Sequence, residues 1–286
     1  MNPEYNFFSD NLCGIISESY DTEQAREMFR SLDELIEHPE RETLLLDRNR
    51  IEKVPVTIEG KSRFWVIKKF TNRGLYKKLV YSLRSSKAKR SYLRACRLVA
   101  NGFGTPVPIG CVEKKKGLFL IAAYYITEFL EYDFDVRSYF RGIEPHCSGI
   151  TPEKFYRRLG RFARKLHSKG FHHADFTDGN ILVTVKTEEC HFSLVDLNRI
   201  CIKKRIGLIS GIRGIVKLNF PPRYRLYLLQ GYCGESYRPL HLFVYRVFRL
   251  LHVMFRDAKK PPKRLRNAIK GLLHKQQPEI SGEQNG

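Results

Sequence analysis

Short apolar runs alternate with polar turns in the first half of the chain. Residues 43–46, 51–58 and 64–70 are rich in aliphatic, β-branched and aromatic side chains and are separated by short polar turns, which predicts three strands. A further strand is predicted at 118–125, after a turn that contains two prolines. Because short turns join neighbouring strands in antiparallel order, we expect a small antiparallel sheet here.

Apolar residues recur at helical spacing in other segments. One helix is predicted over 85–101 and another over 151–169, and each is ended by a glycine. A third is predicted over 22–37, where a proline follows. After Arg199 the chain becomes more helical and strongly basic. The apolar positions are 88, 92, 95, 96 and 99 in the first helix and 155, 159, 162, 163 and 166 in the second.

The segment 170–199, GFHHADFTDGNILVTVKTEECHFSLVDLNR, carries the strongest candidate chemistry. Two β-rich runs with a polar turn between them predict a hairpin. Asp175 and Asn180 come just before the first run, and Asp196 follows the second. Such a hairpin would hold Asp175 and Asn180 at one end and return the chain so that Asp196 lies close by.

That arrangement suits phosphoryl transfer. One carboxylate must align the attacking hydroxyl and accept its proton, and Asp175 fits this role. A second carboxylate and an amide oxygen must hold the magnesium ion that bridges the phosphates, and Asp196 and Asn180 fit that role. His173 is interpreted as a structural brace of the loop. The alternative, in which His172, His173 and Asp175 bind a transition metal, lacks a second ligand cluster at zinc spacing.

The pattern HxDxxxxN followed by a strand and an aspartate is typical of the protein-kinase-like fold. The form DFTDGNILV…FSLVDLNR resembles the bacterial lipopolysaccharide core kinases, which phosphorylate Kdo or heptose residues. The segments WVIKKF (65–70) and SSKAKRSYLRACRLVANGFGTPVPIG (85–110) resemble the same family, in the same order. The resemblance covers roughly residues 44–200.

This resemblance implies a two-lobed α+β fold of the protein-kinase-like type, with a small antiparallel-sheet N-lobe and a mainly helical C-lobe. Residues 1–40 would be an N-terminal helical extension, 41–127 the N-lobe, 128–275 the C-lobe and 276–286 a disordered tail. ATP and Mg²⁺ are the implied cofactors, and ATP would lie between the lobes.

The resemblance also implies nucleotide contacts. Lys68 rather than Lys69 would touch the α- and β-phosphates, since the two point to opposite faces of a strand. The turn at 47–50, which contains Asn49, stands where such a fold covers the phosphates, and Arg48 or Arg50 could add positive charge there. Glu128 lies in the segment that would bind adenine.

The first helix departs from the family pattern at one position. Leu93 stands where the family has a glutamate that pairs with the strand lysine, and the predicted helix contains no acid. Two alternatives stay open: another acid pairs with Lys68, or the nucleotide alone holds this lysine.

Charge and composition indicate the kind of partner. The chain has 51 Lys and Arg against 30 Asp and Glu, a formal net charge of +21, which favours a polyanionic partner over a merely basic surface. An anionic glycolipid acceptor and contact with the inner-membrane surface are expected, whereas nucleic acid is not favoured because no recognised motif supports it. The seven cysteines are odd in number and scattered, which is typical of reduced thiols in the cytoplasm.

The leading interpretation is therefore an ATP- and Mg²⁺-dependent kinase of the lipopolysaccharide inner core. It would be cytoplasmic and peripherally associated with the inner membrane, since no apolar run approaches the ~20 residues of a transmembrane segment. The alternative is a pseudokinase-like scaffold that binds anionic lipid or a protein partner without phosphotransfer. Protein or small-molecule acceptors also stay open.

Overall fold

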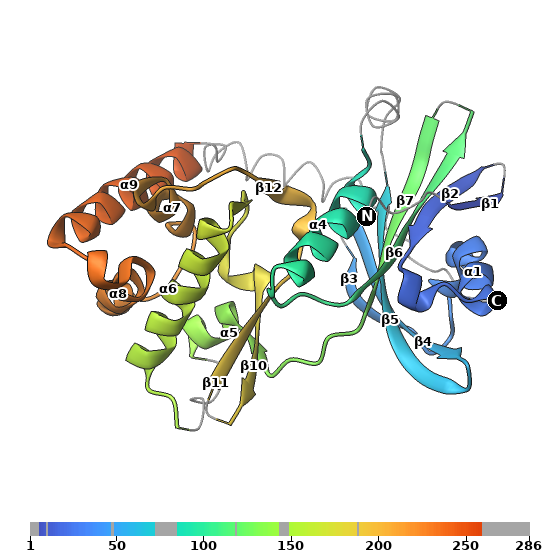
Figure 1. Cartoon of the computed structure of the whole chain (residues 1–286), viewed down its shortest axis with the longest axis horizontal. Coiled ribbons are helices and arrows are strands. Elements are labelled where there is room, and N and C mark those ends of the chain that lie inside the picture. Colours follow the sequence, from blue (N-terminus) through green and yellow to red (C-terminus); the bar gives the residue numbers. More distant parts are fainter. Residues whose placement is uncertain are drawn as a thin grey trace, which may run out of the picture.

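The computed structural model describes residues 6–9, 11–46, 49–71, 85–117, 119–142, 149–187 and 189–258. One lobe is built on an antiparallel sheet, and the other is mainly helical (Figure 1). The two-lobed α+β architecture predicted from the sequence is therefore present.

The N-lobe sheet has seven strands in the order β1-β2-β6-β7-β5-β4-β3, and all neighbours are antiparallel. The strands predicted at 43–46, 51–58, 64–70 and 118–125 are β3, β4, β5 and β7. A two-residue turn with positive φ at Glu59 and Gly60 joins β4 to β5. The bounds are β1 Asn6–Ser9, β2 Leu12–Ile16, β3 Glu42–Leu46, β4 Asn49–Ile58, β5 Lys61–Thr71, β6 Pro108–Lys116 and β7 Phe119–Glu128.

The N-terminal segment differs from its prediction in two ways. Residues 6–9 and 12–16, for which the sequence predicts no strand, form β1 and β2 and extend the sheet beyond β6. The helix predicted over 22–37 is split at Ser31 into α1, Glu23–Arg30, and α2, Leu32–Leu35. Ser31 has a non-helical φ of −108°, and its backbone N–H closes α1 by donating to the carbonyl of Glu27.

Strand alternation gives the sheet two covered faces. The back face carries Trp65 and Ile67, which pack with α1 and α2 in one hydrophobic cluster; Phe29 meets Trp65 edge to face at 6.0 Å. The front face carries Phe70, which belongs to a second cluster formed by α4 and the C-lobe. The front face is therefore the side of the sheet that turns toward the other lobe.

Helix α4, Lys87–Ala100, is the helix predicted over 85–101, and it packs on the front face of the sheet. Its N-terminus is capped by the Ser86 hydroxyl, which accepts from the Lys89 N–H at 3.0 Å. One side of α4 buries Tyr92, Ala95 and Leu98 among other residues, so the helix joins the sheet to the C-lobe core.

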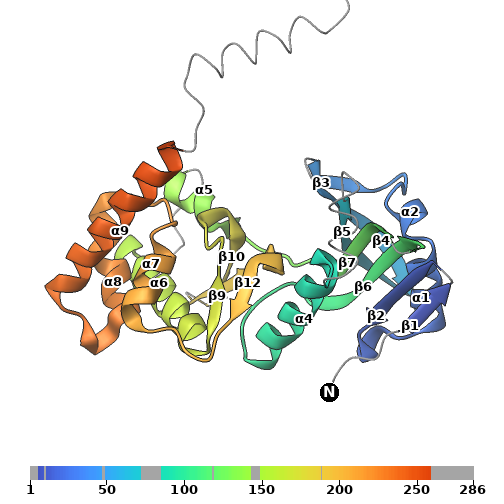
Figure 2. The ribbon, with the colours of Figure 1, turned by 90° about the horizontal axis from the view of Figure 1, so that it is seen from above.

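The C-lobe is organised around α6, Pro152–Ser168, which begins after the predicted cap Thr151 and packs most closely on α8. A Cβ at Gly160 of α6 would meet the backbone of α8, and one at Gly231 of α8 would meet the backbone of α6, so glycine allows this close packing. In Figure 1, α9 lies at the outer edge of the lobe, and Figure 2 shows the same from above. The remaining elements are β8 Phe134–Asp135, α5 Val136–Arg141, β9 Phe171–His173, β10 Ile181–Lys186, β11 Glu189–Leu194, β12 Ile200–Ile202, α7 Leu208–Ile215, α8 Arg225–Cys233 and α9 Pro239–Ala258.

None of the helices in the described ranges combines the length and the apolar character that a bilayer crossing needs.

Candidate active site

The loop after β9 is braced by His173, as predicted. Its Nδ1 accepts from the Asp175 N–H at 3.1 Å, so Nε2 carries the proton and lies 3.3 Å from the carbonyl oxygen of Val195. Burial lowers the pKa of His173, because the charged imidazolium would lose its hydration. A neutral, buried histidine thus joins the Asp175 loop to the end of β11.

The carboxylate of Asp175 remains partly exposed at the edge of this loop. Its own carbonyl oxygen accepts from the Thr177 N–H at 2.8 Å and from Asn180 Nδ2 at 2.9 Å, which fixes the backbone. Its Oδ2 receives Arg199 Nη1 at 3.2 Å. The loop therefore presents an oriented anion with a cation beside it.

The β10–β11 hairpin brings Asp196 next to Asn180, as the sequence predicts. Ile181 pairs with Leu194, and the Val195 N–H donates to the carbonyl of Asn180 at 3.1 Å. Asp196 adopts φ 56° and ψ 49°, a left-handed conformation that aspartate tolerates better than most residues. Strained backbone of this kind is concentrated at functional sites.

Asp196 is the acid that pairs with Lys68. Its Oδ1 lies 2.5 Å from Lys68 Nζ and 2.7 Å from Asn198 Nδ2. Burial alone would raise the pKa of Asp196, but the charge and hydrogen bond of Lys68 outweigh it, so the pKa lies below its usual value. Of the two alternatives for Lys68, the structure shows the one in which another acid, in place of a glutamate at position 93, pairs with this lysine.

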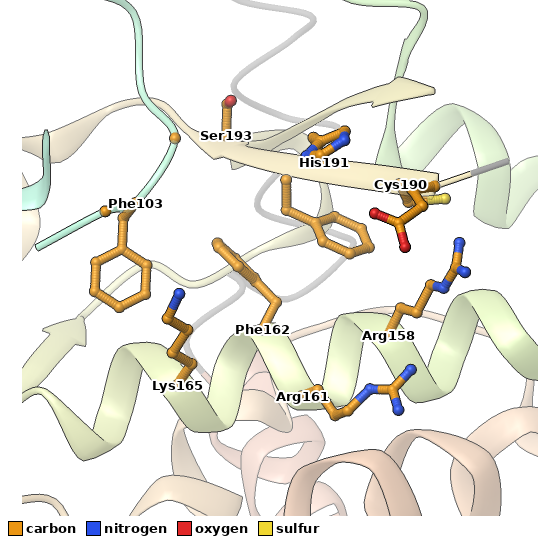
Figure 3. A pocket seen from close by; sticks show the side chains of 12 residues that line it. Phe103, Arg158, Arg161, Phe162, Lys165, Cys190, His191 and Ser193 are labelled. Atoms are coloured by element: carbon orange, nitrogen blue, oxygen red, sulfur yellow. The ribbon is translucent and has the colours of Figure 1, made fainter. Parts of the chain in front are cut away.

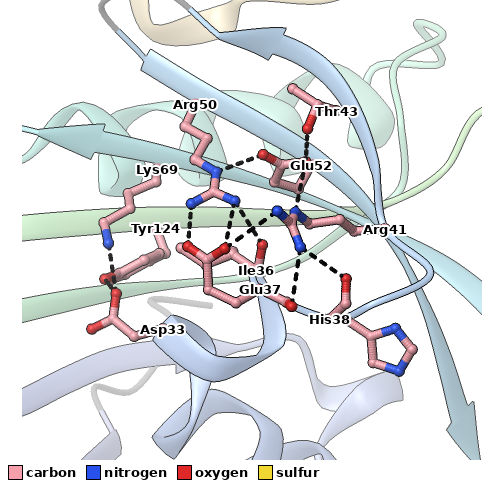
Figure 4. A network of polar contacts seen from close by, with 10 residues as sticks. All are labelled: Asp33, Ile36, Glu37, His38, Arg41, Thr43, Arg50, Glu52, Lys69 and Tyr124. Atoms are coloured by element: carbon pink, nitrogen blue, oxygen red, sulfur yellow. Dashed lines mark hydrogen bonds and ion pairs between the residues drawn. The ribbon is translucent and has the colours of Figure 1, made fainter. Parts of the chain in front are cut away.

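Lys69, the neighbour of Lys68, points the opposite way. Its Nζ lies 2.6 Å from Asp33 Oδ1 on the back face, where the Tyr124 hydroxyl also binds Asp33 at 2.6 Å (Figure 4). Lys114 Nζ binds the other carboxylate oxygen of Asp33 at 2.8 Å. Strand alternation therefore places Lys68, not Lys69, on the side of the lobe junction.

Leu93 and the arginines of α4 lie on the side of that helix that faces β12 of the C-lobe. Leu93 lines a cavity of about 300 Å³ with Arg90, Arg94, Arg97 and Ile202, and none of these residues is acidic. Burial, and then repulsion by Arg90, lowers the pKa of Arg94. Arg94 Nη1 donates to the Asn198 carbonyl, so α4 is attached to the Asp196 loop by an arginine.

The turn predicted to cover phosphates is only partly described. Arg48 lies outside the described residues. Asn49 begins β4 opposite Phe70 and shares the front face with Lys68. Arg50 lies on the back face and binds Glu37, the Ile36 carbonyl and the buried Glu52, as Figure 4 shows. Arg50 is thus engaged in holding α2 to the sheet and does not point at the lobe junction.

Glu128 ends β7, and two of its groups are already bound inside the N-lobe. Its N–H donates to the Val107 carbonyl at 3.0 Å, and its Oε1 lies 2.5 Å from Arg63 Nη1. The following N–H, of Phe129, donates to the Phe64 carbonyl at 2.8 Å. A contact of Glu128 with a nucleotide stays a prediction.

Two basic residues at the site were not singled out from the sequence. Arg199, which pairs with Asp175, stands three residues after Asp196, so the DLNR segment held a signal for it. Lys217 donates to the Ala174 carbonyl, immediately before Asp175. Its position in a long basic stretch gave no such signal, because only the tertiary fold brings the segment after α7 to the loop.

A larger cavity, of about 430 Å³, lies between α6, β11 and the loop after α4 (Figure 3). None of the predicted site residues lines it. Its rim carries Arg158, Arg161 and Lys165, and Phe103, Phe162 and Phe192 contribute aromatic surface. This cavity is separate from the group formed by Lys68, Asp175, Asn180 and Asp196.

The donor set fits a magnesium ion bound together with phosphates. In the described part of the chain there is no group of three or more His, Cys, Asp or Glu that could hold a metal. Magnesium in nucleotide sites needs only one or two carboxylates beside phosphate and water oxygens. Asn180 Nδ2 donates to the Asp175 carbonyl, which fixes the amide and leaves its oxygen as an acceptor near Asp196.

Comparison with known proteins decides the family. The family model "Lipopolysaccharide kinase (Kdo/WaaP) family" matches residues 37–206, more than half of the chain. The chain belongs to the lipopolysaccharide kinase (Kdo/WaaP) family. As a member, it is a kinase of lipopolysaccharide, and the motif 170–199 lies within the matched region.

A solved structure described as "WaaP in complex with acyl carrier protein" is similar to this lipopolysaccharide kinase. The identity is 16%, the TM-score is 0.53, and the match covers 86% of this chain and 98% of the other. At this identity the likeness concerns the fold, and it confirms the protein-kinase-like fold predicted from the sequence. The search of curated proteins gave no match.

Proposed function

We propose that this lipopolysaccharide kinase transfers the γ-phosphate of ATP to a sugar hydroxyl of the lipopolysaccharide inner core, on Kdo or heptose of a lipid A precursor. One observation carries the proposal: β5 and the β10–β11 hairpin bring Lys68 and Asp196 into contact beside Asp175 and Asn180. This group has the residue types that phosphoryl transfer needs, at the junction of the two lobes.

Asp175 is proposed to accept a hydrogen bond from the acceptor hydroxyl, to align its oxygen and to take its proton. The loop bonds to the Asp175 carbonyl hold the carboxylate in place, and His173 ties that loop to β11. Arg199 donates to one oxygen of the Asp175 carboxylate and so helps to orient it. It also adds positive charge close to the transferred group, where negative charge develops.

Lys68 is proposed to bind the α- and β-phosphates while Asp196 and Asn180 hold Mg²⁺. Magnesium–ATP supplies the phosphoryl group and a cation that neutralises the phosphate oxygens. The ion pair between Lys68 and Asp196 supports the proposal, because it brings the two side chains to one site at the junction of the lobes. Asn49, on the same sheet face, and Glu128 stay proposed nucleotide contacts.

The acceptor is proposed to be anionic. Arg90, Arg94 and Arg97 line a cavity with no acid among its lining residues, and Arg94 is bonded to the loop that carries Asp196. Guanidinium groups bind phosphates in a bidentate geometry, so a phosphate of a lipid A precursor suits this cavity. The net charge of +21 favours the same class of acceptor.

We further propose that the protein works at the cytoplasmic face of the inner membrane, where a lipid-anchored acceptor would be reached. The similar solved structure contains an acyl carrier protein, so a protein partner of this class belongs to the proposal for this chain. Adding an acyl carrier protein to the purified chain would test this proposed partner separately. Stable association of the two proteins in size-exclusion chromatography would support it.

The test is transfer of labelled γ-phosphate from ATP and Mg²⁺ to a Kdo–lipid A precursor, by wild type and by Asp175→Ala. Transfer by wild type that falls about 10³-fold or more in the variant supports the proposal. Asp178→Ala in the same loop is less suitable as a control because Asp178 is buried; exposed Asp133→Ala is preferred. Absence of transfer to every acceptor, with wild type and variant alike, would favour the scaffold alternative.

A further inference from the structure

Helix α9 exposes an apolar face along its whole length. Leu240, Phe243 and Phe255 are 62%, 64% and 66% exposed, and these residues mark the two ends of the stripe. At 100° per residue the exposed apolar side chains fall within an arc of roughly 140°. We call this set the α9 apolar face; its members are Leu240, Phe243, Val247, Leu250, Leu251, Met254 and Phe255.

The opposite side of α9 is fixed against the C-lobe. Tyr245 is 1% exposed, and Leu242 and Phe248 pack on the main core. Arg249 donates to the Val216 carbonyl and to Asn219 Oδ1, the latter at 2.8 Å. The helix therefore cannot turn its apolar side inward, and the exposed stripe is a property of the docked helix.

An exposed stripe of this size is uncommon on a protein that remains alone in water. Exposed apolar residues also occur elsewhere on the described part of the molecule. Val99 on α4 and Leu226 on α8 are single positions, and Leu44, Leu45 and Leu46 are three consecutive residues of the edge strand β3. In α9 seven large side chains share one face, which is typical of a surface that binds another protein or a membrane.

The basic residues near α9 indicate what covers its apolar face. Directly after α9 the sequence KKPPKRLRNAIKGLLHK (259–275) has seven Lys and Arg and no acid. Arg246 is exposed on α9 itself, and Arg213 is exposed on α7, which packs against α9. An apolar helix face joined to a cluster of basic residues is the pattern that binds the interface of an anionic bilayer.

We propose that the α9 apolar face docks on an anionic lipid bilayer. Helix α9 lies at the outer edge of the C-lobe, away from the N-lobe sheet in both views of the whole molecule (Figure 1 and Figure 2), so docking on α9 would leave the junction of the lobes open. This deepens the proposed function, which has a lipid-anchored acceptor, but its test measures binding without any transfer of phosphate.

The docked helix is also joined to the catalytic loop by two consecutive contacts. Arg249 of α9 binds the carbonyls of Val216 and Leu218, on either side of Lys217. Lys217 in turn donates to the Ala174 carbonyl, next to Asp175. A bilayer bound to α9 would therefore hold the 216–218 segment, and with it the Asp175 loop, at a defined height above the membrane.

The experiment is co-sedimentation of the full chain with vesicles of phosphatidylethanolamine and phosphatidylglycerol. The test variant is Phe243→Gln/Leu250→Gln/Met254→Gln, which keeps every Lys and Arg. The matched control, Val99→Gln/Phe119→Gln/Leu226→Gln, removes three exposed apolar side chains from three other elements. We expect the partition coefficient to fall at least about 10-fold in the test variant and to stay near wild type in the control.

Insertion is read separately with Phe255→Trp, because Trp65, the other tryptophan of that variant, is buried and adds a constant background. Its emission should shift to shorter wavelength with anionic vesicles and stay unshifted with phosphatidylcholine alone. Equal binding by wild type and test variant would overturn the proposal in favour of charge alone. Absence of binding by wild type, or a dimer in sedimentation velocity that the test variant abolishes, would assign the face to the chain's own C-terminal segment or to a second copy.

Discussion

Lys68 and Lys69 are neighbours on β5, but they bind acids in different parts of the molecule. Lys69 joins Asp33 on the back face, where Arg50, Glu37 and Glu52 complete a network within the N-lobe. Lys68 joins Asp196 of the other lobe, beside a partly exposed Asp175. The comparison teaches that basic residues here divide into cations that hold α2 to the sheet and cations that converge on one reaction site.

The largest expected effect concerns the acid that links the two lobes at the front face. Asp196→Asn removes the partner of Lys68 and the carboxylate proposed to hold Mg²⁺. We expect kcat for transfer to the Kdo–lipid A precursor to fall about 10³-fold, or about 4 kcal/mol of barrier. The control is Asp33→Asn, which removes the corresponding acid of the back face; a comparable loss of kcat there would contradict the division of roles.

A second effect concerns stabilisation by a buried neutral side chain, His167, in contrast to stabilisation by ion pairs. Burial, and then repulsion by His172 and Arg164, lowers the pKa of His167 to about 4, and its Nδ1 lies 2.8 Å from the Tyr232 hydroxyl. The folded-state pKa is below the unfolded value, so the unfolded chain binds the proton first. Stability from this group is therefore complete above pH about 6.5 and is lost as the pH falls toward 4.

We expect the pH dependence to contribute up to about 3 kcal/mol to the free energy of unfolding between pH 7 and pH 4. Urea titrations of wild type and His167→Asn at several pH values give the free energy of unfolding of each protein as a function of pH. The contribution of His167 is the difference between the slopes of these two pH profiles. Parallel profiles, with no reduction of the acid-induced loss in the variant, would show that His167 is not the group that titrates.

A smaller effect tests the back-face network itself. Glu52 is 1% exposed and accepts from Arg50 and from the Thr43 hydroxyl. Glu52→Gln should lower the free energy of unfolding by about 2 kcal/mol, because Arg50 loses a buried anionic partner. Transfer activity per folded molecule should stay within about twofold of wild type, since the network makes no contact with the front face. A selective loss of kcat would join the network to the reaction.

The smallest effect concerns Arg199, whose pair with Asp175 is largely exposed to solvent. Arg199→Ala should lower kcat about tenfold, or about 1.4 kcal/mol, because Asp175 keeps its backbone supports and loses only one nearby cation. Arg205→Ala, also exposed and shortly after it in the chain, is the matched control. If both variants retain full activity, Arg199 has no part in orienting Asp175.

The sequence predicted elements whose pattern is local. Strands β3 to β5, helices α4 and α6 and the β10–β11 hairpin follow from apolar spacing and turns, because each pattern lies within one segment. Strands β1 and β2 were missed because they are short and depend on pairing: β1 pairs with β2, and β2 pairs with β6, about a hundred residues away in the chain.

The candidate site, too, could be predicted only where its residues lie within one segment of the chain. Asp175, Asn180 and Asp196 lie within one motif, and the hairpin places them together. The acid for Lys68 lies 128 positions away, and the contact of Lys217 with the loop depends on how α7 and α9 pack. Such partners are set by tertiary structure, so residue spacing alone does not predict them.

The most direct test of the division between the two faces is one paired measurement. Lys68→Met and Lys69→Met differ by a single position, and both keep a long apolar stem on β5. At limiting ATP, kcat/KM for transfer to the Kdo–lipid A precursor should fall at least about 100-fold in Lys68→Met and less than about threefold in Lys69→Met. Equal losses in two well-folded variants, or a larger loss in Lys69→Met, would contradict the account.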